Sequence, residues 1–272
     1  MTGLKDHGWQ DSFTSSQDNL LEGFYRPVLQ EAVRYWRITG YFSSRSLLQV
    51  LDGVEQLVLA SPDGRGRGQM RLITGFFMSS ADLQALATGL SPSHLLEQQL
   101  TKQFPFKGVT PGDGSVTDLA AELLAWLVQK GHLEIRVGLP SQEGQISSDG
   151  AIFHAKEGVV EDRHGDRLAF TGSINETPNG WSTNYETFDV FCSWSGDQRR
   201  VDAKERHFLR LWQNKDHDAT LSYLASLCRS SVEAFPELAN RPLFPRAMAE
   251  AACLGEEGTD LSRQGFERAL AG

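Results

Sequence analysis

The chain has 272 residues, of which 40% are hydrophobic and 22% are charged, a composition typical of a globular protein with an ordinary core and one that excludes wholesale disorder. Its apolar stretches fall short of the roughly 20 residues that a membrane span needs, and its polar N-terminus has no signal-peptide pattern, so we expect a cytoplasmic protein. The net charge of -9 argues against a general nucleic-acid-binding protein, because neutralising phosphates requires clustered lysine and arginine.

Charge and cysteine placement narrow the class of protein further. The stretch from Arg26 to Arg71 holds seven arginines against four acidic residues, so a locally basic surface and a set of solvated helix faces are both compatible with it. Cys192, Cys228 and Cys253 lie far apart and match no zinc-binding or disulfide spacing. We therefore expect reduced thiols, and no metal or other cofactor.

The first half of the chain alternates strand and helix patterns. Helical periodicity predicts a helix over Asp18 to Tyr35, and aromatic and β-branched residues predict a strand over Arg37 to Ser43. A helix that carries Leu47 to Leu57 then leads to an apolar strand, Met70 to Thr74. This order predicts a strand, helix, strand crossover.

Further helices are expected over Ser79 to Leu100 and over Val116 to Lys130, the second ending at Gly131, and the alternating segment His132 to Val137 predicts another strand. Strands that alternate with helices predict an α/β fold with a mixed, largely parallel sheet flanked by helices.

The second half is richer in short strands. Ala151 to Val160 and Leu168 to Ser173, joined by a turn at Arg163 to Asp166, predict a hairpin, and Phe188 to Trp194 predicts a further buried strand. Two closing helices are expected around Phe208 to Trp212 and Leu221 to Cys228. The predicted organisation is an N-terminal segment (1–17), a catalytic domain (18–215) and a helical C-terminal extension or linker (216–272).

One group of polar residues in this second half has the composition of a candidate active site. Alternate residues of a strand share a face, so His154 and Lys156 are expected to point the same way. If the following strand of the hairpin returns beside them, Gly172, Ser173 and Asn175 bring a hydroxyl, backbone N–H groups and an amide to the same place. The predicted result is a pocket for an oxyanion.

These residue types suit phosphoryl transfer without a metal. A histidine can attack phosphorus and form a covalent intermediate, while lysine, serine and asparagine stabilise charge on the phosphoryl oxygens. A carboxylate can hold the histidine ring in the required tautomer, and Glu186 of the segment Asn184-Tyr-Glu186 is the candidate for that role.

The order H-x-K, then G-S-x-N, then N-x-E resembles the signature of the phospholipase D-like superfamily, in His154, Lys156, Gly172, Ser173, Asn175, Asn184 and Glu186. The resemblance implies a nucleophilic His154, a supporting Glu186, and phosphate binding by Lys156, Gly172, Ser173, Asn175 and Asn184. The family's aspartate, expected five residues after the lysine, is replaced by Glu161 followed by Asp162. Either acid could substitute for it or belong to an exposed hairpin.

A broader resemblance points to a biological setting. Tyr25-Arg-Pro, Gly40-Tyr-Phe-Ser-Ser and the block Gly172 to Trp194 are similar to the phospholipase D-like domain at the N-terminus of bacterial helicase-related proteins of restriction or defence type. No G-x-x-x-x-G-K-[ST] loop occurs in this sequence. A stand-alone nuclease and a domain that works with a separate helicase or ATPase partner both remain open.

The family uses two histidines, but this sequence has a single H-x-K. We therefore expect a homodimer with one composite site, in which one His154 attacks and the other protonates the leaving oxygen. The leading prediction is a DNA endonuclease acting on single- or double-stranded DNA. Trp181 and Tyr185 could stack on bases, although core packing is expected for at least one of them. The alternatives are a phospholipase-type phosphodiesterase, and a non-catalytic module that binds nucleic acid or a helicase.

Overall fold

The computed structural model describes residues 2–60, 68–75, 116–142, 145–146, 151–216 and 219–223. Within these ranges the nine strands form one mixed sheet in the order β1-β8-β7-β6-β2-β3-β4-β5, with β9 also paired to β4. The strands are β1 (Ser12–Thr14), β2 (Ala32–Thr39), β3 (Gln69–Thr74), β4 (Leu133–Gln142), β5 (Gln145–Ile146), β6 (Glu157–Asp162), β7 (Arg167–Gly172), β8 (Thr187–Cys192) and β9 (Ala219–Tyr223).

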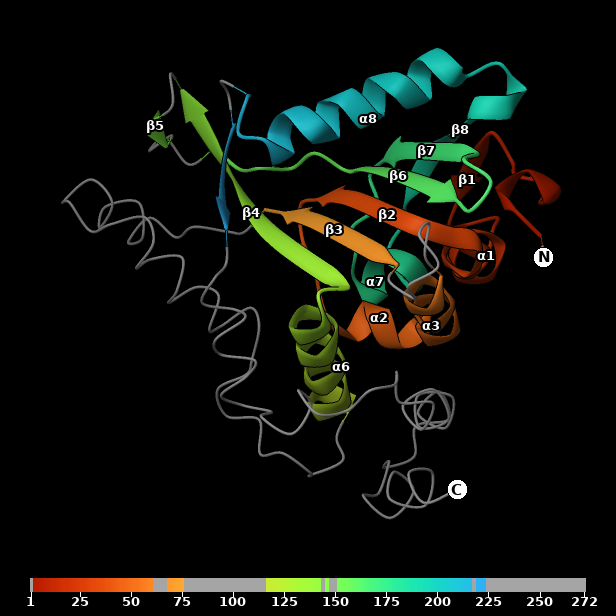
Figure 1. Cartoon of the computed structure of the whole chain (residues 1–272), viewed down its shortest axis with the longest axis horizontal. Coiled ribbons are helices and arrows are strands. Elements are labelled where there is room, and N and C mark those ends of the chain that lie inside the picture. Colours follow the sequence, from red (N-terminus) through yellow and green to blue (C-terminus); the bar gives the residue numbers. More distant parts are fainter. Residues whose placement is uncertain are drawn as a thin grey trace.

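Helices cover both faces of this sheet (Figure 1). On one face α8 (Gln198–Trp212) packs through Val201, Phe208 and Leu211 against Trp36 and other strand residues. The larger core lies on the opposite face and includes side chains of α1 (Arg26–Glu31), α2 (Arg45–Gln49), α3 (Leu51–Leu59), α6 (Val116–Lys130) and α7 (Pro178–Ser182). Short helical turns η1 (Leu4–Asp6), η2 (Leu21–Tyr25) and η3 (Ser193–Ser195) complete the described elements.

The predicted crossover is confirmed. Strands β2 and β3 are parallel, with Ile38 opposite Ile73, and α2 and α3 connect them. The helix predicted over Val116 to Lys130 is present as α6, and Gly131 follows it with a φ of +76°, the left-handed conformation that suits glycine. The predicted hairpin is present as β6 and β7.

The first predicted helix ran too far along the chain. The helical segment η2 and α1 ends at Glu31, and β2 begins at Ala32, five residues before the predicted strand. Aromatic and charged residues of β2 are buried on both faces of the sheet, Trp36 against α8 and Tyr35 in the opposite core. A strand buried on both sides lacks polar alternation, which is why its start resembled a helix face.

The sheet is mixed, but the prediction that it is largely parallel is wrong. Only the β2–β3 and β3–β4 pairings are parallel, and the other six pairings between described strands are antiparallel. Short turns, which can join only antiparallel neighbours, account for β4–β5 and β6–β7, and the other antiparallel pairs join strands farther apart in the sequence.

The helical extension predicted over 216–272 differs from the structure in the part that is described. Residues 219–223, expected in the helical extension, form strand β9 against β4, while 224–272 lie outside the described residues. The helix predicted over Ser79 to Leu100 lies outside them too. No helix in the described part of the chain is long and apolar enough to cross a membrane.

Candidate active site

The polar residues singled out in the sequence gather at one edge of the sheet. Parallel strands β2 and β3 end at this edge, β7 ends there as well, and the antiparallel strands β6 and β8 begin there. His154 and Lys156 precede β6, Ser173 follows β7, and Glu186 precedes β8. In an α/β sheet the edge where parallel strands end is the usual place for a ligand.

His154 and Lys156 lie just before β6 and not within it, because β2, the partner of β6, ends at Thr39 after pairing Ile38 with Glu157. The segment nevertheless stays close to the sheet. A β-carbon at Gly75 would lie 2.3 Å from the backbone oxygen of Phe153, so only glycine lets the chain before His154 cross the end of β3 at this distance.

Three candidate side chains meet at Gly40, the residue after β2. A β-carbon built on Gly40 would lie 3.0 Å from Cδ2 of His154, 3.2 Å from Oδ1 of Asn175 and 3.3 Å from Nζ of Lys156. The imidazole, the amide and the ammonium group therefore converge on one point, although Asn175 is distant in sequence from the other two. This convergence places an imidazole, a group that can attack phosphorus, beside an ammonium group and an amide, groups that can bind a phosphoryl oxygen.

The two basic groups differ in exposure and bonding. Lys156 is 6% exposed, and its Nζ donates a hydrogen bond to the backbone oxygen of His154 at 3.0 Å. The side chain of His154 is exposed, and within the described ranges no hydrogen bond to its ring is found. Burial, together with the charge of Lys156, lowers the pKa of His154, which favours the neutral, nucleophilic imidazole.

Burial and two neighbouring charges shift the pKa of Lys156. Burial lowers its pKa, the nearby Arg37 guanidinium lowers it further, and the Glu186 carboxylate opposes both. One of the three ammonium N–H groups is used in the bond to the His154 carbonyl. Lys156 is thus held in place while it keeps donors that can face a phosphate.

Ser173 and Glu186 form a second pair beside this group. The Ser173 hydroxyl donates to Oε2 of the buried Glu186 carboxylate and accepts a hydrogen bond from the Thr187 backbone N–H at 3.1 Å. The Asn184 side chain donates to Oε1 of Glu186 at 3.2 Å. Within one chain, Glu186 therefore holds Ser173 and Asn184, and it does not orient the His154 ring as expected. Gly172 ends β7 next to Ser173.

A buried ion pair lies beneath the site and was missed in the sequence. Arg37 of β2 is fully buried and donates through Nε to Oε2 of Glu176 at 2.8 Å and through Nη2 to the Ile174 carbonyl at 2.6 Å. Tyr35 donates to the other carboxylate oxygen of Glu176 at 2.7 Å. Burial and the charge of Glu176 raise the pKa of Tyr35 well above its ordinary value, so its hydroxyl remains a donor.

This pair fixes the chain on both sides of Asn175. The backbone N–H of Glu176 donates to Thr39 Oγ1 at 3.1 Å, and Oδ1 of Asn175 accepts from the Tyr41 backbone N–H at 3.1 Å. A signal for the pair was present in the sequence, because an arginine inside an apolar strand needs a buried partner. Its partner could not be identified, since Glu176 is 139 residues away.

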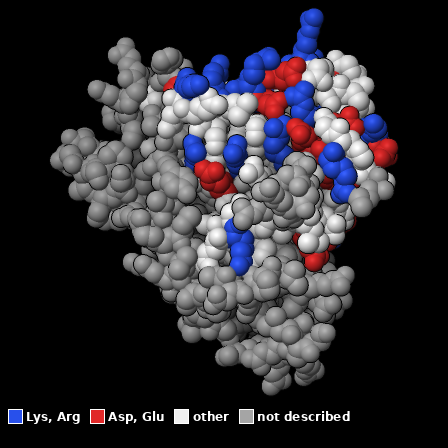
Figure 2. Space-filling view, viewed as in Figure 1, with Lys and Arg blue, Asp and Glu red and all other residues white. Residues whose placement is uncertain are grey.

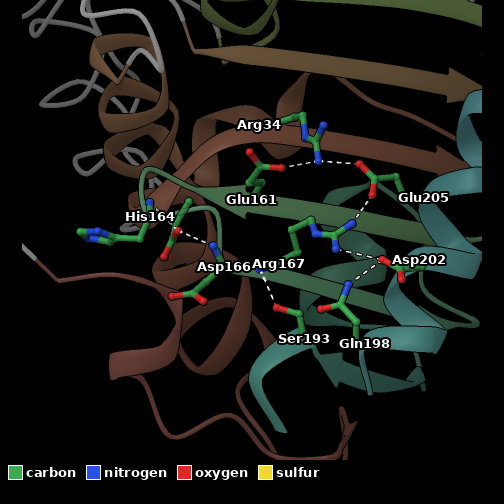
Figure 3. Close-up of polar contacts among 10 residues, drawn as sticks. Arg34, Glu161, His164, Asp166, Arg167, Ser193, Gln198, Asp202 and Glu205 are labelled. Carbon is green, nitrogen blue, oxygen red and sulfur yellow. Dashed lines mark hydrogen bonds and ion pairs between the residues drawn. The ribbon is translucent and has the colours of Figure 1, made fainter. Parts of the chain in front are cut away.

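Glu161 and Asp162 do not reach the site. They end β6, whereas His154 and Lys156 precede its start. Glu161 forms an ion pair with Arg34, and the buried Asp162 carboxylate accepts the backbone N–H groups of His164 at 2.8 Å, Asp166 at 3.0 Å and Leu4 at 2.8 Å. Figure 3 shows Glu161 linked through Arg34 to Glu205 of α8. Asp162 therefore stabilises the hairpin turn, and Glu161 links β6 to β2.

The two aromatic residues proposed to stack on bases have different positions. Trp181 is 2% exposed and stacks on Tyr25 with ring centroids 4.3 Å apart, so it is the one of the two that packs in the core, as was expected for at least one of them. Tyr185 is 75% exposed and adjoins Glu186. It is the aromatic residue of the two that a ligand can reach.

Gly40→Ala is expected to reduce activity about 10- to 100-fold, because contacts of 3.0 to 3.3 Å would push His154, Asn175 and Lys156 apart by tenths of an ångström. Gly8→Ala is the matched control, since a β-carbon there meets nothing within 4 Å. Cleavage rates and urea unfolding of both variants check this. Unchanged activity in Gly40→Ala would show that the convergence does not matter for catalysis.

No protein-family model matches this sequence, and no curated protein matches it. Among solved structures, the chain is similar to NucT from Helicobacter pylori, with 10% sequence identity and a TM-score of 0.40 over 74% of this chain and 94% of that chain. A similarity this distant carries no weight for function, so the function is argued from the geometry of the site.

Proposed function

We propose that this chain is a metal-independent phosphodiesterase that cleaves DNA through a covalent intermediate on His154. The observation that supports it is the convergence of His154, Lys156 and Asn175 over Gly40 at the carboxyl edge of the sheet. The order of these residues also resembles the phospholipase D-like signature.

In the proposed first step a neutral His154 nitrogen attacks phosphorus, a P–N bond forms, and the P–O bond to the leaving group breaks. Lys156 and the amide of Asn175 stabilise the negative charge on the phosphoryl oxygens. The leaving oxygen takes a proton from a general acid. In the second step water attacks phosphorus, returns that proton to the acid, and breaks the P–N bond.

The general acid is proposed to be His154 of a second copy in a homodimer. This would follow from two-fold symmetry, which can place two His154 rings on opposite sides of one phosphodiester. Mixing the protein with His154→Ala chains tests the idea. After equal amounts are mixed and exchanged, about a quarter of the dimers contain two His154 residues, so activity per total chain should fall to about a quarter. A fall to only one half would contradict the shared site.

The proposed activity is tested with purified protein and single- and double-stranded DNA in EDTA, with acid-free quenching and mass spectrometry of the peptide that contains His154. Cleavage with a phosphoryl adduct on that histidine is expected. Absence of cleavage, or cleavage without an adduct under single-turnover conditions, would overturn the proposal. Membership in a restriction or phage-defence system is proposed on the sequence resemblance alone.

A nucleophilic His154 also predicts a pH dependence. Because burial and Lys156 lower the pKa of His154, the neutral form persists below the ordinary histidine pKa of about 6.5, and the acid limb of activity should lie below that value. Lys156→Gln removes a positive charge and should raise the pKa of His154, as measured by NMR titration of the ring. Lys5→Gln, at a distant exposed site, should leave it unchanged. A lower or equal pKa in Lys156→Gln would be inconsistent with this electrostatic effect.

A further inference from the structure

The charges of α8 are divided between its two sides. Its acidic residues, Asp202 and Glu205, face the sheet, where Asp202 binds Arg167 at 2.9 Å and Glu205 binds Arg34 at 2.7 Å as well as Arg167. Figure 3 shows these pairs linking the helix to strands β2 and β7. Both acidic side chains of the helix are thereby neutralised by sheet arginines.

The outward side of the helix carries Arg199, Arg206 and Arg210, here called the α8 ridge. These residues are seven and four positions apart, a spacing that places them on one helix face, and all three are exposed. Arg210 lies 3.3 Å from Asp216, whereas Arg199 and Arg206 have no acidic partner among the described residues. Figure 2 shows basic side chains along the upper edge, where α8 lies in Figure 1.

The middle of α8 also lies close to the candidate active site. Lys204 and His207 bind the carboxylate of Glu157 at 2.7 and 2.9 Å, and Glu157 directly follows Lys156. Burial opposes ionisation of Glu157, but its bonds to His207 and Lys204 lower its pKa overall, so it remains an anion that neutralises these two neighbours. Among the arginines and lysines of α8, Arg199 and Arg206 are the ones with no acidic partner in the described part of the chain.

We infer that the α8 ridge binds the phosphate backbone of a nucleic acid whose scissile phosphodiester lies at His154. A chain with a net charge of -9 has no general attraction for phosphates, so phosphates would gather where exposed arginines such as Arg199 and Arg206 form no ion pair. Arg199 and Arg210 are 11 residues apart along the helix, or about 16 Å, which matches about five phosphate spacings along one strand of a duplex. The inference rests on the proposed nuclease function, to which it adds the contact surface.

The test compares two double variants, each in a His154→Ala background and in EDTA so that no substrate is cut. One is Arg199→Gln/Arg206→Gln on the ridge. The other is Lys5→Gln/Arg163→Gln, which removes the same charge from exposed positions near the hairpin turn. Binding of fluorescein-labelled single- and double-stranded oligonucleotides is measured by anisotropy across a range of salt concentrations.

The ridge variant should lose at least about tenfold in affinity at low salt, and the slope of log K against log salt concentration should fall by about 2, one for each phosphate contact. The control should bind as its parent does. Equal losses in both variants, or no loss in the ridge variant, would overturn the inference.

A small substrate separates this inference from the proposed function. With His154 intact, the ridge variant should hydrolyse bis(4-nitrophenyl) phosphate as fast as the wild type, because that diester is too small to reach the ridge. Loss of this activity would mean that the substitutions damage the site, which overturns a pure binding role. A wild-type chain that hydrolyses the small diester but binds no nucleic acid would contradict both the ridge and the nucleic-acid substrate.

Discussion

Replacing His154 by alanine is expected to reduce DNA cleavage by at least about 10³-fold while leaving the fold intact. The proposed mechanism loses both its nucleophile and, in a homodimer, its general acid. The exposed His154 ring has no hydrogen bond in the described part of the chain, so its removal should change the free energy of unfolding by no more than about 0.5 kcal/mol. Single-turnover cleavage and urea denaturation measure the two effects.

His164→Ala provides the matched control. It makes the same chemical change at an exposed histidine in the turn between β6 and β7, at the opposite end of β6 from His154. Its activity should equal that of the wild type. If His154→Ala retains activity within tenfold of the control, His154 is not the nucleophile, and a non-catalytic binding role becomes the better account of the chain.

Glu176→Ala is expected to destabilise the protein by about 3 to 5 kcal/mol, because it leaves the Arg37 guanidinium buried without its counter-ion. Arg37 is fully buried and Glu176 is 2% exposed, so water cannot replace the lost carboxylate without opening the core. The loss should appear as a lower urea midpoint with an unchanged slope. Since Glu176 follows Asn175, activity should also fall under conditions in which the variant is fully folded.

Glu161→Ala is the control, because Glu161 of β6 pairs with Arg34, which lies on β2 as Arg37 does. Glu161 pairs with Arg34, but Arg34 is partly exposed and keeps Glu205 as a second partner, so the expected loss is below about 1 kcal/mol. The double variant Arg37→Met/Glu176→Leu should recover part of the loss seen in Glu176→Ala, because it removes both buried charges. A double variant less stable than Glu176→Ala would contradict this account.

Local sequence patterns were sufficient for several elements. The β6–β7 hairpin, the helix α6 with its glycine stop at Gly131, and the crossover from β2 to β3 all follow from periodicity and turn chemistry over short stretches of chain. The same local reasoning predicted that His154 and Lys156 share a face of a strand. They precede β6 and do not lie in it, but the structure brings both to Gly40 with Asn175. Their catalytic roles remain predictions.

Other features depended on contacts between distant segments. The start of β2 could not be read from periodicity, because its aromatic residues face two different cores. The sequence could not show whether Glu161 or Asp162 replaces the aspartate of the phospholipase D-like signature. In the structure Glu161 pairs with Arg34, and Asp162 caps the hairpin turn. The sequence could not show which of Trp181 and Tyr185 is buried, and the structure buries Trp181 against Tyr25.

The sequence by itself therefore determined the residue types that suit phosphoryl transfer and the local elements that carry them. The tertiary structure decided where charge is neutralised: Arg37 is paired with Glu176 beneath the site, and the acids of α8 are paired with Arg34 and Arg167, which leaves the α8 ridge basic. The physical reason is that hydrophobic periodicity acts between neighbouring residues, whereas the partner of a buried or half-buried charge is chosen by the packing of strands and helices distant in sequence.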